Sequence, residues 1–483
     1  MHDLEPFAVI TLLAGLALLL AVGSNHLAER IRVPAPALFL IVSAIASDLA
    51  PRLGNLSIVV DQRIVTVALV VILFEGGMHI GWARMRAAVG AVVWLGVAGT
   101  VVTAGAMALS AHWLFGFDWR AGLLLGTALA PTDPAVVFSV LGRREISGRT
   151  GTLLEGESGA NDPVGIALMV SLLGTEGGGW SALGSGLGHF ALQMGIGAAF
   201  GAAGGWLLAQ VMRRVPLPNE ALYPVQTMAF AVLLYGATTA LHGSGFLAVF
   251  LAGILVGDAR APYKREIERF AGALASIAEI VAFVVLGLSI NLGSIFDGNR
   301  IWTALGMAAL LILVVRPLLV GLVLLPVRLR WGERLFVTLS GLKGAVPILL
   351  GTYVLVEDAH RASDIYNIVF VVVFVSVMLQ GGLVPTLARL LDVPMRVIEP
   401  EPWSLGMRFQ HEPEGLHRYV VARGSAADGC RIDELDVGES FWVSMVSRHG
   451  RLVQVRGSTV LQAGDEVLAL VEEADGPDAV FRQ

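Results

Sequence analysis

Apolar stretches, each about as long as a membrane-crossing helix, follow one another from the N-terminus to about residue 391. A helix needs about 20 consecutive apolar residues to cross the hydrocarbon core of a bilayer. Short polar stretches separate the apolar ones, as expected where a chain leaves the membrane and turns. We therefore predict thirteen membrane-spanning helices, near residues 6–24, 33–48, 64–82, 87–110, 121–141, 153–174, 187–212, 221–242, 244–257, 270–290, 301–326, 335–356 and 365–391.

The charges of the loops between these helices predict the orientation of the chain. If the N-terminus lies outside, the inner loops carry sixteen Lys and Arg residues and the outer loops carry five. An excess of Lys and Arg marks the cytoplasmic side of a membrane protein. We therefore expect an odd number of spans in the cytoplasmic (inner) membrane, with the N-terminus outside and the C-terminal part in the cytoplasm.

The pattern changes after residue 392. Pro and Glu are frequent in residues 393–414, which we interpret as a linker. Residues 415–478 hold short β-like runs, and turn signals such as Ala463-Gly464-Asp465 separate them. We predict a transmembrane domain of residues 1–392, followed by the linker and a small cytoplasmic α+β or β-rich domain.

Composition agrees with an α-helical polytopic membrane protein. Of the 483 residues, 55% are apolar and 15% charged, and the mean hydropathy is +0.73. A soluble globular protein has about 25% charged residues. The single Cys430 excludes an intramolecular disulfide. Residues 1–5 lack the positive charge of a signal peptide, so we expect the first apolar stretch to be retained as a helix.

Acidic residues stand inside two consecutive predicted spans. Asp133 lies within the span at 121–141, while Glu157 and Asp162 lie within the span at 153–174. An ionisable side chain at bilayer depth costs roughly 2.5–3.5 kcal/mol, which makes it a candidate functional site. We interpret the pair of spans as a place where a cation or a proton binds in the middle of the membrane.

The residues around these acids suit a monovalent cation. Pro131 and Pro134 each disfavour helix at the residue before them, which predicts an extended backbone with free carbonyls around Thr132. On the next span, Ser158 and Asp162 share a helix face. A carboxylate buried away from water also gains proton affinity, so one group can hold either a proton or a cation. We expect Asp162 to be the exchanging carboxylate, with Asp133 next; alternatively, each is a neutralised structural group.

Helix-breaking residues recur in two spans that are seven apart and therefore opposite in orientation. Pro131 and Pro134 interrupt the fifth span, and Gly341, Gly344 and Pro347 interrupt the twelfth. Such breaks at matching places in inverted six-helix repeats indicate the midplane site of a transporter. Ordinary proline kinks are the alternative.

Arg316 and Lys343 are basic residues well inside the predicted spans, whereas Arg389 stands near the end of the last one. Arg316 is the expected ion-pair partner of Glu157, because a lone buried charge is expensive. Lys343 either offsets the negative helix end at the breaks or extends to the membrane surface. Glu75 either joins the site or lies near the cytoplasmic end of the third span, and for Glu279 we favour a structural role.

Five motifs taken together resemble the NhaP-type branch of the monovalent cation:proton antiporters. They are Phe74-Glu75-Gly76-Gly77, Ala130-Pro131-Thr132-Asp133-Pro134, Leu154-Glu155-Gly156-Glu157-Ser158-Gly159-Ala160-Asn161-Asp162, Val315-Arg316-Pro317 and Gly341-Leu342-Lys343-Gly344-Ala345-Val346-Pro347. The resemblance implies a thirteen-helix homodimer, with crossing broken helices and an elevator motion of a core domain against a dimerisation domain. It departs from the family at Lys343, where many relatives have Arg.

The resemblance also implies roles for individual residues. It makes Asp162 the essential ion-binding residue, and further cation ligands would be Thr132, Asp133, Ser158 and Glu75. Glu157 and Arg316 would form a stabilising ion pair. Asn161 stands where electrogenic relatives carry a second Asp, so this chain resembles the electroneutral branch. One titrating carboxylate can exchange one proton for one K⁺ or Na⁺, and both ions remain candidates.

Residues 415–475 resemble the C-terminal half of RCK regulatory domains, of the TrkA-C type. The run from Arg451 to Leu468 carries this resemblance. It implies a regulatory domain that binds a small ligand of the nucleotide type, and a dimer-stabilising β module is the alternative.

Two other classes of function are weighed against the antiporter. One alternative is a ligand-gated ion channel, or a sensor of ions or ligands that does not transport, in which the tail gates an ion pathway. The chain shows no selectivity-filter signature, which argues against this alternative. An enzyme would need a nucleophile–base pair or a metal cluster, and the ten His residues are scattered. We expect no enzyme activity, no cofactor and no nucleic-acid partner.

Overall fold

The computed structural model describes residues 15, 34–49, 57–134, 137–138, 141, 144–146, 148–175, 180–296, 299–397, 416–435, 437, 441–448, 451–471 and 478–481. The chain divides into two compact units, residues 1–403 and 404–483. The predicted first helix, at 6–24, lies outside the described residues except for Gly15.

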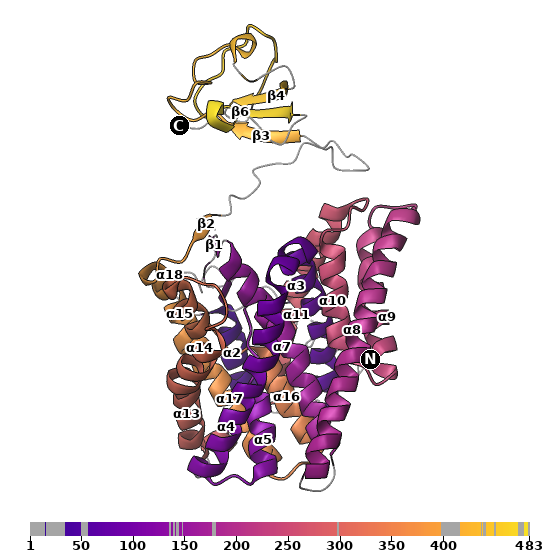
Figure 1. Ribbon diagram of the computed structural model, residues 1–483, viewed down its shortest axis with the longest axis vertical. Coiled ribbons are helices and arrows are strands. Elements are labelled where there is room, and N and C mark those ends of the chain that lie inside the picture. The colour runs from indigo at the N-terminus through magenta and orange to yellow at the C-terminus, as the bar shows by residue number, and fades with distance from the viewer. Residues whose placement is uncertain are drawn as a thin grey trace, which may run out of the picture. The chain divides into compact units, whose positions relative to one another are not determined.

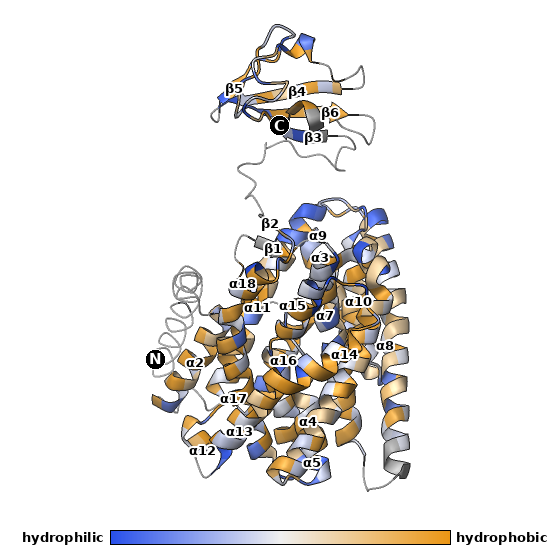
Figure 2. Ribbon diagram, turned by 60° about the vertical axis from the view of Figure 1, so that its left-hand side comes forward, coloured by the Kyte–Doolittle hydropathy of each residue, from blue (hydrophilic) through white to orange (hydrophobic). Residues whose placement is uncertain are grey.

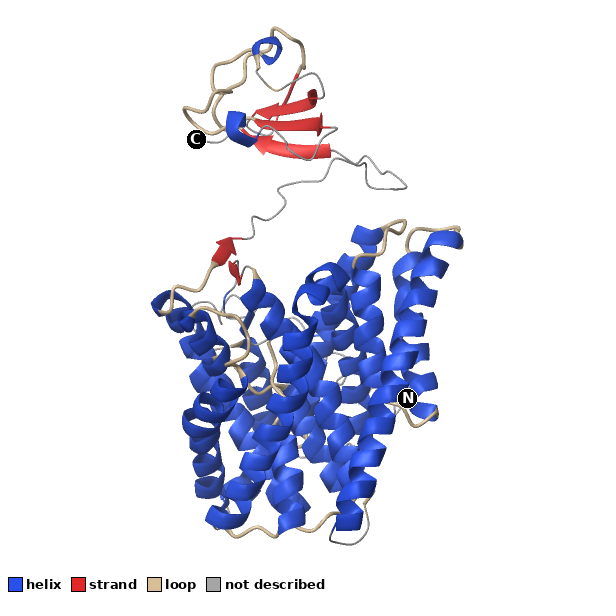
Figure 3. Ribbon diagram, viewed as in Figure 1, coloured by secondary structure: helices blue, strands red, loops and turns tan. Residues whose placement is uncertain are grey.

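The first unit is a bundle of helices that lie side by side, many of them roughly parallel or antiparallel (Figures 1 and 3). Its helices are α2 (Ala35–Leu49), α3 (Ile58–Trp94), α4 (Thr100–Phe115), α5 (Trp119–Ala128), α7 (Arg149–Leu173), α8 (Trp180–Arg214), α9 (Leu222–Ala240), α10 (Gly245–Gly257), α11 (Lys264–Leu288), α12 (Leu292–Phe296), α13 (Arg300–Leu310), α14 (Gly321–Val323), α15 (Trp331–Leu339), α16 (Ala345–Val356), α17 (Ala362–Ser376) and α18 (Gly382–Leu390). π-Helical turns join α3 to α4, α13 to α14 and α17 to α18, at Leu95–Gly99, Leu311–Val320 and Val377–Gly381.

Hydrophobic residues predominate along most helices of this bundle (Figure 2). Large side chains such as Trp206 and Leu233 are 62% and 66% exposed. Within the described residues, five helical segments are long and apolar enough to cross a membrane: Ile58–Phe115, Gly184–Arg214, Lys264–Leu288, Arg300–Val323 and Ala362–Leu390. A bilayer is the solvent in which such a surface is stable, because backbone polar groups are satisfied within each helix.

A sharp kink divides the longest helical segment. The 58 residues of Ile58–Phe115 would extend about 87 Å as a straight helix, against a bilayer core of about 30 Å. Gly81 breaks the segment with φ +68°, a conformation that glycine adopts without steric cost. The carboxylate of Asp258, just after α10, accepts a hydrogen bond from the backbone of Ala83. We expected the turn at residues 83–86; it lies at Gly81 because the positive φ is available there and Asp258 satisfies the backbone beyond it.

The predicted fifth and twelfth spans are both broken. After α5 ends at Ala128, residues 129–134 are not helical. The other break, residues 340–344, separates α15 from α16. The first break holds Pro131 and Pro134, and the second holds Gly341 and Gly344, whereas Pro347 lies in the first turn of α16. Both are breaks rather than simple kinks.

The start of α5 is capped outside the predicted span. The Oδ2 atom of Asp118 accepts a hydrogen bond from the backbone N–H of Ala121 at 3.1 Å, and Oδ1 lies 3.1 Å from Nδ1 of His360. Partial burial raises the pKa of Asp118, but these two contacts outweigh it and hold the pKa below its ordinary value. The charged cap therefore favours the helix that leads to the first break.

A short ribbon connects the loop before α7 with the residues after α18. Strand β1 (Arg144–Ile146) pairs antiparallel with β2 (Met395–Val397), and Ile146 lies opposite Met395. We expected residues 393–414 to be a linker, and its first residues form this strand instead. The backbone after the last helix is thus fixed to the loop from which α7 begins.

The second unit is a four-stranded antiparallel sheet with strand order β3-β6-β4-β5. The strands are β3 (Leu416–Val420), β4 (Phe441–Arg448), β5 (Arg451–Val453) and β6 (Glu466–Val471), and the short helix α19 (Asp478–Phe481) follows them. Alternate strand residues such as Tyr419, Val446 and Val467 form its core with Phe481. The small strand region predicted from the β-like runs is therefore present.

Arg448 and Asp465 form an ion pair in this second unit, in which the carboxylate is buried and the guanidinium is partly exposed. Asp465 has no exposed surface, and it accepts two hydrogen bonds from Arg448, at 2.8 and 2.7 Å. Hydrogen bonding to Asp465 raises the pKa of the Arg448 guanidinium. The same carboxylate accepts the backbone N–H of Gln462 at 2.9 Å, which fixes the turn before β6.

We expect Asp465→Ala to destabilise the second unit by about 2 kcal/mol, because hydrogen bonds to charged groups contribute roughly 1.5–3 kcal/mol. Amide hydrogen exchange of β6 in the full chain measures this loss. The control is Asp433→Ala, which removes an exposed pair with Arg431 and should cost less than about 1 kcal/mol. Equal protection of the β6 amides from exchange in both variants would show that the pair of Arg448 and Asp465 contributes no more than the exposed pair.

Candidate ion-binding site

The two helix breaks lie against each other. The backbone N–H of Asp133 donates a hydrogen bond to the carbonyl of Leu342 at 2.9 Å. A Cβ atom at Gly344 would overlap the side chain of Asp133, so this close approach requires glycine. Two segments more than 200 residues apart in the chain therefore form one irregular stretch of backbone inside the bundle.

Helix α7 is joined to the first break by side-chain hydrogen bonds. Asn161 accepts the backbone N–H of Thr132 through Oδ1 at 3.2 Å and donates from Nδ2 to Thr132 Oγ1 at 2.7 Å. The hydroxyl of Ser158 lies 3.2 Å from the same Thr132 Oγ1. An ionised carboxylate at position 161 could accept the first of these hydrogen bonds but could not donate one to Thr132 Oγ1. The amide therefore holds Thr132 in place without adding a charge.

Asp162 lies on α7, one turn after Ser158. It is 7% exposed, and its Oδ1 atom is buried and has no hydrogen-bond partner among the described residues. Its carboxylate interacts electrostatically with Asp133 and with Lys343. Asp162 thus has an oxygen free to bind a small cation or a proton.

Pro163 adds a feature that the sequence analysis did not use. It stands inside α7 and has no backbone N–H, so the carbonyl of Gly159 lacks its usual helical donor. This carbonyl lies on the turn that carries Ser158 and Asp162. The signal was present in the chain, since a proline directly follows Asn161-Asp162.

Lys343 reaches from the second break to the first. Only 1% of the residue is exposed, and its ammonium donates hydrogen bonds to the carbonyls of Ala130 and Pro131, at 2.9 and 3.0 Å. These carbonyls follow the C-terminal end of α5, where the helix dipole is negative. Of the two alternatives for Lys343, this geometry matches the offset of the broken helix end, because the side chain does not reach the membrane surface.

Glu157 and Arg316 lie in contact beside the breaks. Arg316 Nη2 is 3.4 Å from Glu157 Oε1, and both side chains are almost fully buried. The guanidinium also donates to the carbonyls of Thr338 and Val337, at the end of α15. A Cβ atom at Gly341 would overlap this guanidinium, so the second break also needs a glycine there.

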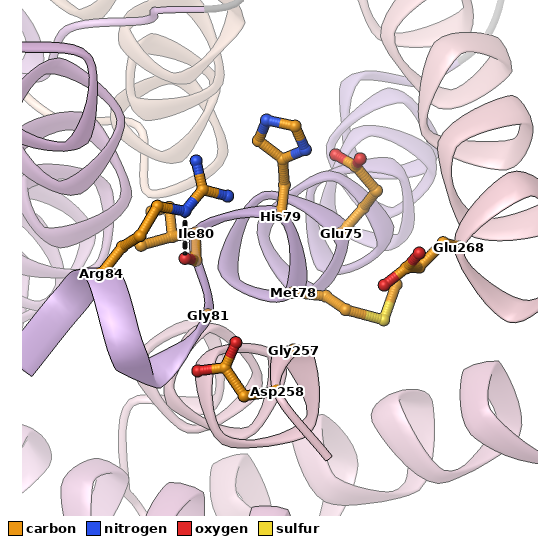
Figure 4. Close-up of a pocket in the computed structure, with 9 residues that line it drawn as sticks. All are labelled: Glu75, Met78, His79, Ile80, Gly81, Arg84, Gly257, Asp258 and Glu268. Carbon is orange, nitrogen blue, oxygen red and sulfur yellow. Dashed lines mark hydrogen bonds between the residues drawn. The ribbon is translucent and has the colours of Figure 1, made fainter. Parts of the chain in front are cut away.

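Glu75 lies apart from this network, on α3. It lines a pocket of about 370 Å³ beside the Gly81 kink (Figure 4). The pocket is polar and carries charged groups of both signs, and its lining residues are Glu75, Met78, His79, Ile80, Gly81, Arg84, Gly257, Asp258 and Glu268. The structure therefore brings together Thr132, Asp133, Ser158, Asn161, Asp162 and Lys343, with Glu157 and Arg316 adjacent, and places Glu75 at a neighbouring pocket.

Removing one partner of the buried ion pair should be costly. We expect Arg316→Met to destabilise the protein by about 3 kcal/mol, because it leaves the Glu157 carboxylate buried without its counter-charge. Adding Glu157→Gln should restore part of that stability. The melting temperatures of the three purified variants in detergent measure this. A double variant no more stable than Arg316→Met would show that the pair itself contributes little.

The chain is similar to known membrane transporters over most of its length. The family described as "Sodium/hydrogen exchanger, transmembrane" matches residues 15–390. The K(+)/H(+) antiporter NhaP of Alkalimonas amylolytica is 33% identical, over 98% of this chain and 83% of the relative. The K(+)/H(+) antiporter NhaP2 of Shewanella sp. (strain MR-4) is 32% identical, over 97% and 81%.

A solved structure shares the fold. The sodium proton antiporter MjNhaP1 from Methanocaldococcus jannaschii superposes with a TM-score of 0.65 at 24% sequence identity. The match covers 78% of this chain and 99% of that chain. The helical unit therefore has the fold of a membrane transporter.

Proposed function

This chain belongs to the sodium/hydrogen exchanger family, and we propose that it exchanges one monovalent cation for one proton, with both ions competing for Asp162. The observation that carries this proposal is the buried Oδ1 atom of Asp162, which has no hydrogen-bond partner in the described part of the chain. The hydroxyls of Thr132 and Ser158 lie 3.2 Å apart, and Ser158 stands one turn before Asp162 on α7. Pro163 frees a backbone carbonyl on the same turn. Hard monovalent cations prefer such oxygen ligands.

Charge counting supports an electroneutral exchange. The two acids nearest the ion are Asp162 and Asp133, and Lys343 balances one of them. Glu157 and Arg316 neutralise each other, and Asn161 contributes no charge. One positive charge, carried by a proton or by a cation, completes the balance. The site can therefore load one ion at a time and exchange them one for one.

The hydrogen bonds around the site favour movement as one body. Asn161 joins α7 to the first break, and Lys343 and the N–H of Asp133 join the two breaks. These contacts make α5, α7, α15 and α16 a single rigid group. We infer an elevator-type movement of this group, within inverted six-helix repeats, against a second domain that forms a homodimer.

The names of the similar proteins suggest which cation is exchanged. The relatives at 33% and 32% identity are named K(+)/H(+) antiporters. The Na(+)/H(+) antiporter ApNhaP of Aphanothece halophytica is 26% identical over 81% of this chain. We therefore propose K⁺ as the first candidate and Na⁺ as the second. The membrane is the cytoplasmic (inner) membrane, with the N-terminus outside and the second unit in the cytoplasm.

The second unit is proposed to regulate exchange. It has its own core and its own sheet. On its resemblance to RCK domains we assign it a small ligand of the nucleotide type. A ligand-gated channel or a non-transporting sensor is the less favoured alternative. A channel needs no buried carboxylate that a proton and a cation can share.

We expect Asp162→Asn to abolish cation-dependent proton movement, because the amide can neither bind a proton nor neutralise a cation. Inside-out vesicles with an acidic interior would receive K⁺, Na⁺ or Li⁺ separately, and the loss of the proton gradient is followed by a fluorescent dye. Asp61→Asn removes another buried acid, on α3, and should leave exchange intact. Exchange that persists in Asp162→Asn would contradict the assigned role.

The exchange rate of the intact chain should follow a bell-shaped pH dependence. At low pH protons occupy the site and block cation loading, while at high pH too few protons remain for the return step. Rates measured in vesicles with equal pH on both sides test this expectation. A rate that rises across the whole stable range without turning over would count against competition at a single carboxylate.

A further inference from the structure

Glu279 is an acidic residue in the middle of α11, and no basic side chain pairs with it in the described part of the chain. Its Oε1 atom is buried and accepts no hydrogen bond from the residues that the structure describes. The two charged side chains with which it interacts electrostatically are Asp133 and Glu75, and both are acidic. A carboxylate in such surroundings must hold a proton or attract a cation, because an isolated buried charge is expensive.

Glu279 is one of several carboxylates that interact electrostatically with one another. Glu75 lines the pocket beside the Gly81 kink (Figure 4), and Glu279 interacts both with Glu75 and with Asp133. Asp133 in turn interacts with Asp162. Helix α11 packs against α3, which carries Glu75, and against α16, which follows the second break. Glu279 thus adds a buried carboxylate on a helix that packs against the helix of Glu75 and against α16.

A purely structural role accounts poorly for this geometry. A structural carboxylate in a membrane helix is expected to pair with a basic side chain or with backbone donors. The buried basic residues of the ion-binding site already have such partners, since Lys343 binds the carbonyls of the first break and Arg316 binds Glu157. The free oxygen of Glu279 therefore remains available to a positively charged ion.

We propose that Glu279 is a cation-positioning residue, whose carboxylate on α11 attracts a monovalent cation between the pocket at Glu75 and the site at Asp133 and Asp162. This inference rests on the proposed exchange of cations and protons. Asp162 remains the group at which the two ions compete. Glu279 raises the occupancy of the site by the cation and leaves the ratio of one cation to one proton unchanged.

The test compares Glu279→Gln, Glu279→Asp and the control Glu266→Gln, which changes an exposed acid on the same helix. The first readout is the K⁺ concentration that gives half-maximal exchange in vesicles. The second is the K⁺ concentration that gives half of the maximal rise in melting temperature of the purified full chain, with choline chloride keeping the ionic strength constant. A ligand that binds the folded state raises the melting temperature in this way.

We expect Glu279→Gln to raise both half-saturating concentrations about tenfold, which corresponds to about 1.4 kcal/mol, while the maximal exchange rate changes less than about twofold. Glu279→Asp keeps the charge and should lie within about threefold of the intact chain. A structural role predicts the opposite order, because Gln preserves the shape of Glu and Asp does not.

Two results would overturn the inference: a half-saturating K⁺ concentration for Glu279→Gln equal to that of Glu266→Gln, or an equal shift in Glu279→Asp and Glu279→Gln. The melting readout separates this inference from the proposed function. If the intact chain moved no protons in response to K⁺, the exchange proposal would fail, while the shift in K⁺ binding would still decide the role of Glu279.

Discussion

The site depends on one constraint: the backbone N–H and C=O groups at the two helix breaks must find hydrogen-bond partners inside the bundle. Water is absent from the hydrocarbon core, so each freed N–H and C=O needs a partner from the protein. Lys343 supplies donors to Ala130 and Pro131, and Arg316 supplies them to Thr338 and Val337. The two breaks satisfy each other through the bond from Asp133 to Leu342. The irregular backbone is therefore stable at a depth where it would otherwise be costly.

This arrangement determines which acidic group remains available. Lys343 and Arg316 are basic residues well inside the predicted spans, and both donate hydrogen bonds to backbone carbonyls at the breaks. Arg316 also neutralises Glu157, whereas Asp162 keeps an oxygen without a hydrogen-bond partner among the described residues. The same basic groups that stabilise the breaks thus leave the carboxylate of Asp162 incompletely balanced. That imbalance is what a proton or a cation can correct.

Glycine makes these contacts sterically accessible. A side chain at Gly344 would collide with Asp133, and one at Gly341 would collide with the guanidinium of Arg316. Gly165 of α7 lies in the same way against Pro131. Because α7 and both breaks approach so closely, a shift of one element must displace the others. Close packing of this kind supports the movement of the site as one body rather than the opening of a pore through it.

The sequence by itself determined the features that act over a few residues. Apolar length predicted the helices, Pro131 and Gly344 marked the breaks, and the acids at 133 and 162 stood out because a membrane helix seldom carries them. Tertiary structure decided what those residues touch. Lys343 binds a carbonyl 213 residues away, and Glu75 lies in a pocket beside a kink whose position depends on Asp258. The surroundings of Glu279 are likewise set by other helices, because the acidic residues that act on it electrostatically are Asp133 and Glu75. Hydropathy and helix breakers act locally along the chain, whereas the balance of buried charges depends on how distant helices pack.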